Sequence, residues 1–481
     1  MPFLTNLLVA LAFLGAAFNP LSIVSRPVTT GMLPQSQQPQ TQSLSGTTTI
    51  YLPVITTSVA APAVTGYFVA TTGSDSNPGT LNSPWRTIQH AVGAAPNNKT
   101  IYIRAGEFTG FVVERTNLTI SGYPGETPSI LNDGNSKYTV KVMNSSGITL
   151  SGLAFRDNMQ QYGVGIYIED SNGVLVKNSA FYDNQGFGVV TKNVTNVTLD
   201  GNDLYRNANA IEIRYTGNGV LISNNKIHHN FREIDPGRGA MGINFYKTAG
   251  SISAIGNQLW ENHSIGLDNP EGSAFEVYAG GSIAIISNVI WDNETVLETG
   301  TTEGAACPNI TFMRNIVFRG NRQQGLILRC ASNSLFAHNI FDGLDEYVFY
   351  ITHLRGNYGG SIEGLRIVNN IAVNGRVYSI EGSIPDSVEI DNNLVYNPGS
   401  SALRGDSLAY VEGQGNTKLL SDFQQWTGYD LHSRSTFPSF VNTSILDYRP
   451  LSTSPAIDLG KFLGESYLGS APDAGAYEYA P

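Results

Sequence analysis

The sequence predicts an all-β chain wound into a parallel β-helix, a solenoid of about ten coils. A short sequence phrase recurs: an asparagine, two or three residues, an aromatic or aliphatic residue, and then a second asparagine. Its leading asparagines stand at positions 178, 202, 225, 257, 288, 315, 339, 370 and 393. Between phrases lie short runs that alternate apolar and polar residues, such as 210–215 and 242–247. A period of two over four to six residues is typical of strands, so the repeat unit is built from strands and not helices.

Each repeat of roughly 23 residues has room for three short strands, which make one coil. Successive coils then pair in parallel at about 4.8 Å. The repeated asparagines are expected to stack into a ladder at one corner, where each side-chain amide bonds its neighbour. The repeated Phe, Leu, Ile and Val residues stack inside as the core.

The segments outside the repeats predict the remaining organisation. An apolar run at 7–18 has signal-peptide length, so 1–33 is interpreted as a signal peptide or N-terminal anchor, with cleavage expected near Ala16–Ala17. Residues 34–65 form a linker rich in Ser, Thr, Gln and Pro. The β-helix domain spans 66–481: an N-terminal cap and first coil at 66–137, regular coils at 138–397, and an irregular C-terminal cap at 398–481. A helix at 84–95 is expected to close the N-terminal end, with Ile88, Ala91 and Val92 on one face.

Composition limits the possible partners. The net charge is -11 and 14% of residues are charged, with no basic patch that would bind nucleic acid. After signal cleavage no integral membrane domain is expected, and the chain is predicted to be a monomer. The sequence has no phosphate-binding loop, no dinucleotide fingerprint and no zinc-binding motif.

The two cysteines fall at nearly the same place on adjacent coils. Cys307 lies eight residues before Asn315, and Cys330 lies nine before Asn339. A separation of one coil is compatible with a disulfide, and a secreted chain favours that bond over two buried thiols.

The chain resembles the secreted right-handed parallel β-helix proteins, the fold shared by pectate lyases and their relatives. The resemblance rests on the repeats and on two further stretches, 71–92 and 454–479, and it covers about residues 66–479. It implies the handedness of the solenoid, an extracellular or cell-surface location, and a polysaccharide as the partner. The same fold carries lyases, hydrolases, epimerases, adhesins and inert spikes, so it does not fix the activity.

Strand alternation also predicts a line of polar side chains on the outside of the solenoid. If Ile213, Phe245 and Val277 point inward, then a column of polar residues one per coil points outward: Glu212, Asn244, Glu276 and Glu298. Carboxylates on neighbouring coils repel, so a cation, an arginine or a raised pKa must offset them. The neighbouring outer column contains Arg214, Tyr246, Tyr278 and, further on, Arg329. The two longest insertions, 231–240 and 263–272, add Arg238, His263 and Asp268 beside these columns.

Three hypotheses fit these residue types. Similarity to lyase sites of this fold implies that Ca²⁺ neutralises a substrate uronate, that Lys247 or Arg329 abstracts a proton, and that β-elimination follows. The metal ligands would be Asn244, Glu276, Glu298 and Asp268, although the chain lacks the consecutive aspartates of some calcium-dependent lyases. The residues expected to bind substrate are Glu212, Arg214, Tyr246, Tyr278, Arg238 and His263. In the second hypothesis Glu276 and Glu298 act as the acid and base of a glycoside hydrolase. In the third, the surface with Tyr246, Tyr278 and Trp260 binds a glycan without turnover, or the solenoid is a structural spacer.

Overall fold

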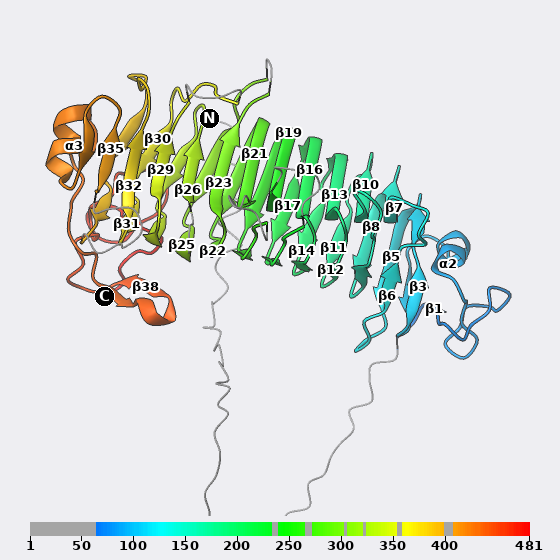
Figure 1. Ribbon diagram of the computed structural model, residues 1–481. Helices are drawn as coiled ribbons and strands as arrows, with labels where there is room; N and C mark the ends of the chain where they lie inside the picture. Colours follow the sequence, from blue (N-terminus) through cyan, green and yellow to red (C-terminus); the bar gives the residue numbers. More distant parts are fainter. Residues whose placement is uncertain are drawn as a thin grey trace, which may run out of the picture. The chain divides into compact units, whose positions relative to one another are not determined.

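The computed structural model describes residues 64–232, 239–264, 272–302, 305–320, 324–353, 358–398 and 407–481. The described residues from 64 onward belong to one compact unit, 64–481. In this unit short strands stack along one axis as three parallel ribbons (Figure 1). Successive strands visit the first, second and third ribbons in turn, as do β16, β17 and β18.

The first ribbon carries the predicted site. Its strands are β4 (Phe111–Val113), β7 (Tyr138–Met143), β10 (Val164–Glu169), β13 (Phe187–Thr195), β16 (Asn209–Asn218), β19 (Ala240–Ile255), β21 (Gly272–Ile286), β23 (Thr295–Gly300), β26 (Gln324–Leu328), β29 (Tyr347–Ile351), β32 (Arg376–Ile380) and β35 (Ala409–Val411). Strands β19 and β21 are long enough to continue into the second ribbon.

The other two ribbons complete each coil. The second ribbon contains β1 (Tyr67–Val69), β2 (Lys99–Ile103), β5 (Thr116–Gly122), β8 (Ser146–Ser151), β11 (Leu175–Lys177), β14 (Thr198–Asp200), β17 (Val220–Ser223), β24 (Asn309–Met313), β27 (Leu335–Ala337), β30 (Arg366–Val368) and β33 (Glu389–Asp391). The third contains β3 (Glu107–Thr109), β6 (Ser129–Leu131), β9 (Ala154–Arg156), β12 (Ala180–Tyr182), β15 (Asp203–Tyr205), β18 (Lys226–His228), β20 (Gln258–Trp260), β22 (Val289–Trp291), β25 (Ile316–Gly320), β28 (Ile340–Leu344), β31 (Ile371–Val373) and β34 (Leu394–Tyr396).

The core follows the alternation seen in the sequence. Ile213 pairs with Phe245 and Phe245 with Val277 on successive strands, and all three side chains are fully buried. One continuous apolar cluster runs through the coils from the first strands to Phe423. Because the inward faces are apolar in every coil, the register of the first ribbon is set by burial of these residues.

The asparagine phrases form two ladders, where one was expected. In the first ladder each Nδ2 donates to the next Oδ1 at 2.9–3.1 Å, through Asn202, Asn225, Asn257, Asn288, Asn315, Asn339, Asn370 and Asn393. The trailing asparagine of the phrase makes the second ladder, with the same bonds at 2.8–3.2 Å through Asn184, Asn207, Asn230, Asn262 and Asn293. All members are buried, so the ladders satisfy amides that would otherwise be costly inside the protein.

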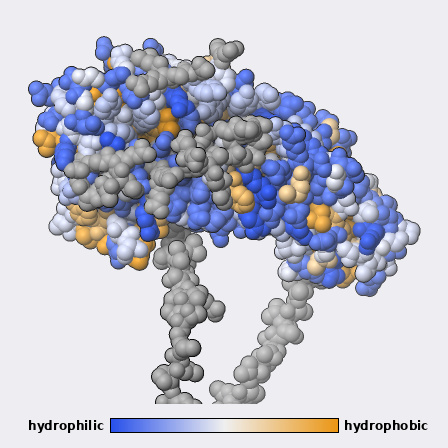
Figure 2. Space-filling model, viewed as in Figure 1, coloured by the Kyte–Doolittle hydropathy of each residue, from blue (hydrophilic) through white to orange (hydrophobic). Residues whose placement is uncertain are grey.

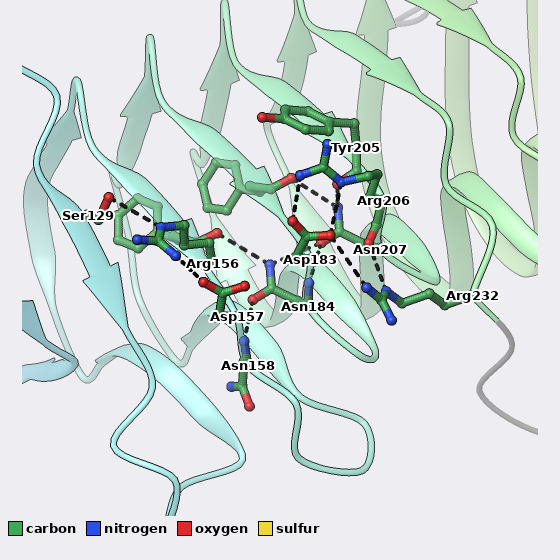
Figure 3. Close-up of polar contacts among 12 residues, drawn as sticks. Ser129, Arg156, Asp157, Asn158, Asp183, Asn184, Tyr205, Arg206, Asn207 and Arg232 are labelled. Carbon is green, nitrogen blue, oxygen red and sulfur yellow. Dashed lines mark hydrogen bonds and ion pairs between the residues drawn. The ribbon is translucent and has the colours of Figure 1, made fainter. Parts of the chain in front are cut away.

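Figure 3 shows the start of the second ladder and the ion pairs outside it. The residue before each ladder asparagine turns the chain in a left-handed conformation, as at Asp183 and Arg206, with φ of 57° and 55°. The turn directs these side chains outward, where Arg206 forms a two-bond pair with Asp183 and Arg232 adds a longer contact of 3.4 Å.

Aromatic rings stack on the outer face of the third ribbon. Tyr182, Tyr205, His228, Trp260, Trp291 and Phe318 lie nearly parallel on successive strands, with ring centroids 4.2–5.5 Å apart. Each internal ring has a neighbour on both faces, so sugar stacking could use only ring edges or the ends of the row. Trp260 belongs to the third ribbon, whereas Tyr246 and Tyr278 belong to the first, so the three rings do not form one surface.

The two ends differ from the regular coils. Helix α2 (Ile88–Ala94) begins later than expected because Thr87 caps it by accepting the His90 N–H, while Trp85 bonds to Phe68 in the strand region. At the other end lie β36 (Gly415–Thr417), helix α3 (Leu420–Thr427), the antiparallel pair β37 (Phe440–Asn442) and β38 (Asp447–Pro450), and the short helix η1 (Thr443–Ile445). Apolar residues of this C-terminal region, such as Phe440 and Tyr448, pack on the third ribbon. No helix within the described residues is long and apolar enough to cross a membrane.

The structure links Cys307 to Cys330 by a disulfide, with Cα atoms 5.1 Å apart. The bond joins neighbouring coils just beyond β23 and β26. Figure 2 shows that the surface in this view is mostly hydrophilic, with separate apolar patches.

Candidate functional site

Glu212, Asn244, Glu276 and Glu298 lie side by side on the first ribbon, and we call them the site column. The strand register pairs Glu212 with Asn244, Asn244 with Glu276, and Glu276 with Glu298, on β16, β19, β21 and β23. Glu276 and Glu298 are paired in register on neighbouring strands, so their carboxylates are on adjacent rungs, that is, on strands about 4.8 Å apart.

Glu212 is buried, which differs from the exposed outer position expected for it. Its side chain is 1% exposed and forms an ion pair with Arg214 on the same strand. The amides of Asn209 and Asn244 also donate to its Oε2 at 3.4 Å. The alternation was right about the direction of the side chain but could not show that these neighbours close around it. Glu212 and Arg214 therefore form an ion pair on β16, in which the carboxylate is buried and the guanidinium is partly exposed.

The two other acids keep partial exposure and have distinct partners. Glu298 forms an ion pair with Arg329 and accepts the Tyr278 hydroxyl at 2.8 Å. Glu276 accepts the Ser273 hydroxyl at 2.9 Å. Arginines therefore supply part of the counter-charge that three acids on four rungs require. Arg329, held in this pair, is a poor proton acceptor, because a guanidinium stays protonated in proteins.

Lys247 stands at the edge of the column. It is exposed and has a left-handed conformation with φ of 48°, at the point where the pairing of β16 with β19 shifts register. Its Nζ lies 5.4 Å from the ring centroid of Tyr246. Its exposed amine at the edge of the column makes Lys247 a candidate general base.

The column offers oxygen ligands for a hard cation. Asn244 Oδ1 is buried and, among the described residues, lacks a hydrogen-bond partner. The carboxylates of Glu276 and Glu298 follow on the next two rungs, and amide and carboxylate oxygens are the donors that Ca²⁺ prefers. No group of three His, Cys, Asp or Glu side chains suited to a metal occurs within the described residues. A cation here would therefore depend on the amide oxygen of Asn244 and on further oxygen ligands.

The remaining predicted residues are dispersed. Arg238 and Asp268 lie outside the described residues. His263 follows the third ribbon, where its charge lowers the pKa of Asp292, although burial, the largest effect, raises that pKa overall. Tyr246 pairs with Tyr278 in register, and their rings meet Tyr215 and Tyr358 edge-on.

Sequence reasoning missed residues that extend the column in both directions. Towards the N-terminus the register continues through Val190 to Tyr167 and Lys141. Towards the C-terminus it continues from Glu298 through Ile327, Tyr350 and Ser379. The alternation of 138–143 and 347–351 is enough to predict that Lys141 and Tyr350 point outward. The predicted column includes only the coils in which acidic residues recur, so it stops short of them.

Comparisons with known proteins agree with this architecture. A family model described as Pel9A-like, right handed beta helix region matches residues 67–326, which include the whole site column and Lys247. The crystal structure of pectate lyase Pel9A aligns with a TM-score of 0.52 and 17% identity, covering 86% of this chain and 96% of that one.

Two further structures match more weakly. A rhamnogalacturonan lyase has a TM-score of 0.43 and 13% identity, covering 78% of this chain and 90% of that chain. The catalytic domain of a GH87 alpha-1,3-glucanase has a TM-score of 0.46 and 16% identity, covering 79% and 69%. Among curated proteins none matches the sequence. The family match spans more than half of the chain, and the parallel solenoid agrees with it. The chain therefore belongs to the family of Pel9A-like right-handed β-helix proteins.

Proposed function

We propose that the chain is an extracellular lyase that cleaves an acidic polysaccharide by β-elimination. The observation that supports this most directly is the arrangement on the first ribbon: oxygen ligands on adjacent rungs, with an exposed lysine at their edge. The apolar run at 7–18 and the disulfide between Cys307 and Cys330 support a location outside the cell. We further propose that the protein acts as a monomer.

In this reaction Lys247, in its neutral form, takes the proton α to the uronate carboxyl group. The electron pair of that C–H bond forms the new double bond between the α and β carbons. The bond between the β carbon and the glycosidic oxygen breaks, and the oxygen leaves with that bonding pair and takes a proton from water. Bound Ca²⁺ would neutralise the uronate and so acidify the α proton. Asn244, Glu276 and Glu298 would hold the ion, while Arg329 keeps Glu298 in place through their ion pair. Tyr246 and Tyr278 flank the sugar on the neighbouring outer column.

One observation favours a second function, glycoside hydrolysis. Glu276 and Glu298 occupy adjacent rungs, at roughly the carboxyl separation of about 5 Å that retaining glycosidases use. In that reading Glu298, paired with Arg329, would be the nucleophile and Glu276 the acid.

Incubation with a panel of acidic and neutral polysaccharides distinguishes the two. An ultraviolet-absorbing unsaturated uronide indicates elimination, and new reducing ends without that absorbance indicate hydrolysis. The Lys247→Met variant should lose elimination, whereas a hydrolase would keep its activity. Binding without any product would refute both and leave a glycan-binding protein.

A further inference from the structure

An apolar cluster separate from the core lies on the first ribbon, on the N-terminal side of the site column. Its buried members are at most 7% exposed, two partly buried tyrosines pack against them, and we call the whole set the aromatic platform: Tyr138, Tyr162, Val164, Tyr167, Phe187 and Val190. Strands β7, β10 and β13, which carry most of it, adjoin β16 (Figure 1). The register runs from Tyr167 through Val190 to Glu212, where the site column begins.

Ring contacts hold the platform together and join it to the site column. Tyr138 stacks on Tyr167, with ring centroids 4.4 Å apart. The guanidinium of Arg214 lies 5.2 Å from the centroid of the Phe187 ring, and the same group forms the ion pair with Glu212. Because one side chain contacts both sets of residues, the platform and the column are adjoining parts of one surface.

Two lysines lie against the rings of the platform. The Nζ of Lys137 is 5.2 Å from the Tyr162 ring centroid, and that of Lys141 is 5.6 Å and 5.9 Å from the centroids of Tyr138 and Tyr167. These distances are typical of cation–π contacts, which position an ammonium group without neutralising its charge. Within the part of the chain that the structure describes, neither ammonium group forms a hydrogen bond or an ion pair.

The acid that is nearest in the register is bound to a different lysine. Lys192 Nζ donates to Glu169 Oε1 at 2.8 Å. This bond lowers the pKa of Glu169, and the charge of Lys141 adds to the lowering. Lys141 is therefore within electrostatic reach of Glu169 without forming an ion pair with it. An incoming carboxylate can bind such a lysine without first breaking an ion pair of the protein.

The register gives the distance between these lysines and the proposed cleavage site. Lys141 is three rungs from Glu212 and five rungs from Glu276. At about 4.8 Å per rung these separations are about 14 Å and about 24 Å. A polysaccharide that lies along the first ribbon reaches both places, whereas a disaccharide is too short to do so.

We propose that the aromatic platform binds carboxylate-bearing units of the same acidic polysaccharide, and that Lys137 and Lys141 recognise those carboxylates. The tyrosine rings suit the apolar faces of sugars, and ammonium groups attract carboxylates as point charges. This inference rests on the proposed function for the identity of the bound chain. It adds that long chains are engaged far from the point of cleavage, so the protein prefers polymers to short oligomers.

Binding is measured in the Lys247→Met chain, so that turnover does not consume the probe. Polygalacturonate and alginate are the acidic probes and dextran is the neutral one, and each is titrated by calorimetry with Ca²⁺ and with EDTA. At least one acidic polymer should bind more tightly than dextran in EDTA, because the platform needs no metal. Replacing both lysines, Lys137→Gln with Lys141→Gln, should weaken that binding about fivefold. The difference should disappear near 1 M salt, where the screening length is about 3 Å.

Matched variants separate recognition from overall charge. Lys177→Gln with Lys226→Gln removes two lysines from the second and third ribbons and should bind like the parent chain. Lys137→Arg with Lys141→Arg keeps both charges and should retain the affinity. In the chain that carries Lys247, the Lys137→Gln and Lys141→Gln pair should raise KM for the polymer about fivefold and leave kcat unchanged.

Three results would overturn the assignment of the platform. They are equal binding of dextran and both acidic polymers, full affinity after Lys137→Gln with Lys141→Gln, and an equal loss after Lys177→Gln with Lys226→Gln. Turnover is scored separately. If the chain that carries Lys247 forms no product, the lyase assignment fails, whereas a loss of acidic-polymer binding confined to the platform variant still supports the platform.

Discussion

Asp430 ends the first asparagine ladder, and replacing it by asparagine should change how stability depends on pH. The carboxylate is fully buried and accepts Asn393 Nδ2 at 3.0 Å and the Ser433 hydroxyl. Burial raises its pKa from 3.8 to about 6, against the hydrogen bonds that lower it. An acceptor is needed here because every amide along the ladder donates in the same direction. Asp430→Asn retains an acceptor oxygen for Asn393 and removes the charge.

The sign follows from the raised pKa. Between pH 3.8 and about 6 the folded protein binds more protons at Asp430 than the unfolded chain, so wild-type stability falls as pH rises through this window. A shift of about two pKa units corresponds to about 3 kcal/mol. The Asp430→Asn variant has no carboxyl group at this position, so its stability does not fall with pH for this reason. Because part of this loss has already occurred at pH 4, the variant should gain about 2 kcal/mol relative to wild type between pH 4 and pH 7, whatever its absolute stability.

Urea unfolding at pH 4, 5, 6 and 7 at constant ionic strength measures the difference. Hydrogen exchange of residues 388–434 checks that the unfolding event includes the end of the ladder. Ser433→Ala serves as a control, because it removes a bond to the same carboxylate and keeps the charge. If the stability difference between wild type and Asp430→Asn stays constant from pH 4 to pH 7, folding does not raise the pKa of Asp430 and the reasoning is wrong.

Three further predictions concern the site and the disulfide. Glu276→Ala should leave the free energy of unfolding unchanged or slightly higher, because it relieves repulsion between adjacent acids, and should abolish turnover; lower stability with intact turnover would make the column structural. Lys247→Met should reduce kcat by about 10²–10⁴-fold without changing stability, whereas Lys226→Met, an exposed lysine on the third ribbon, should match wild type in both assays. Cys307→Ser with Cys330→Ser should lower unfolding free energy by about 3 kcal/mol, and reductant should then have no further effect on unfolding.

The sequence was sufficient for features that depend only on the alternation of inward and outward side chains along a strand. Period-two alternation is enough to place Asn244 beside Glu276, because both lie one residue from an inward aromatic side chain in equivalent strands. The second asparagine ladder was within reach too, since the trailing asparagine recurs at nearly constant spacing.

Features that depend on several distant segments were not predictable in this way. Glu212 is buried and contacts Asn209 and Asn244, and these contacts have no periodic signature in the sequence. The cavity lined by Ile327, Tyr350, Ser379 and Tyr410 depends on four aligned coils, and the outward residues there follow no shared pattern beyond the ladder asparagines. Arg238 and Asp268 fall in insertions that follow no repeat and lie outside the described residues.

The stacked rings on the third ribbon give this solenoid an intrinsic optical signal that depends on the spacing of its coils. Trp260 and Trp291 are parallel at 4.7 Å, so their electronic transitions couple, and the resulting exciton signal depends on rung spacing. His228 stacks on Trp260 at 4.2 Å and continues the row. Movement along these rungs therefore changes the protein's own optical signal, and no external dye is needed to follow it.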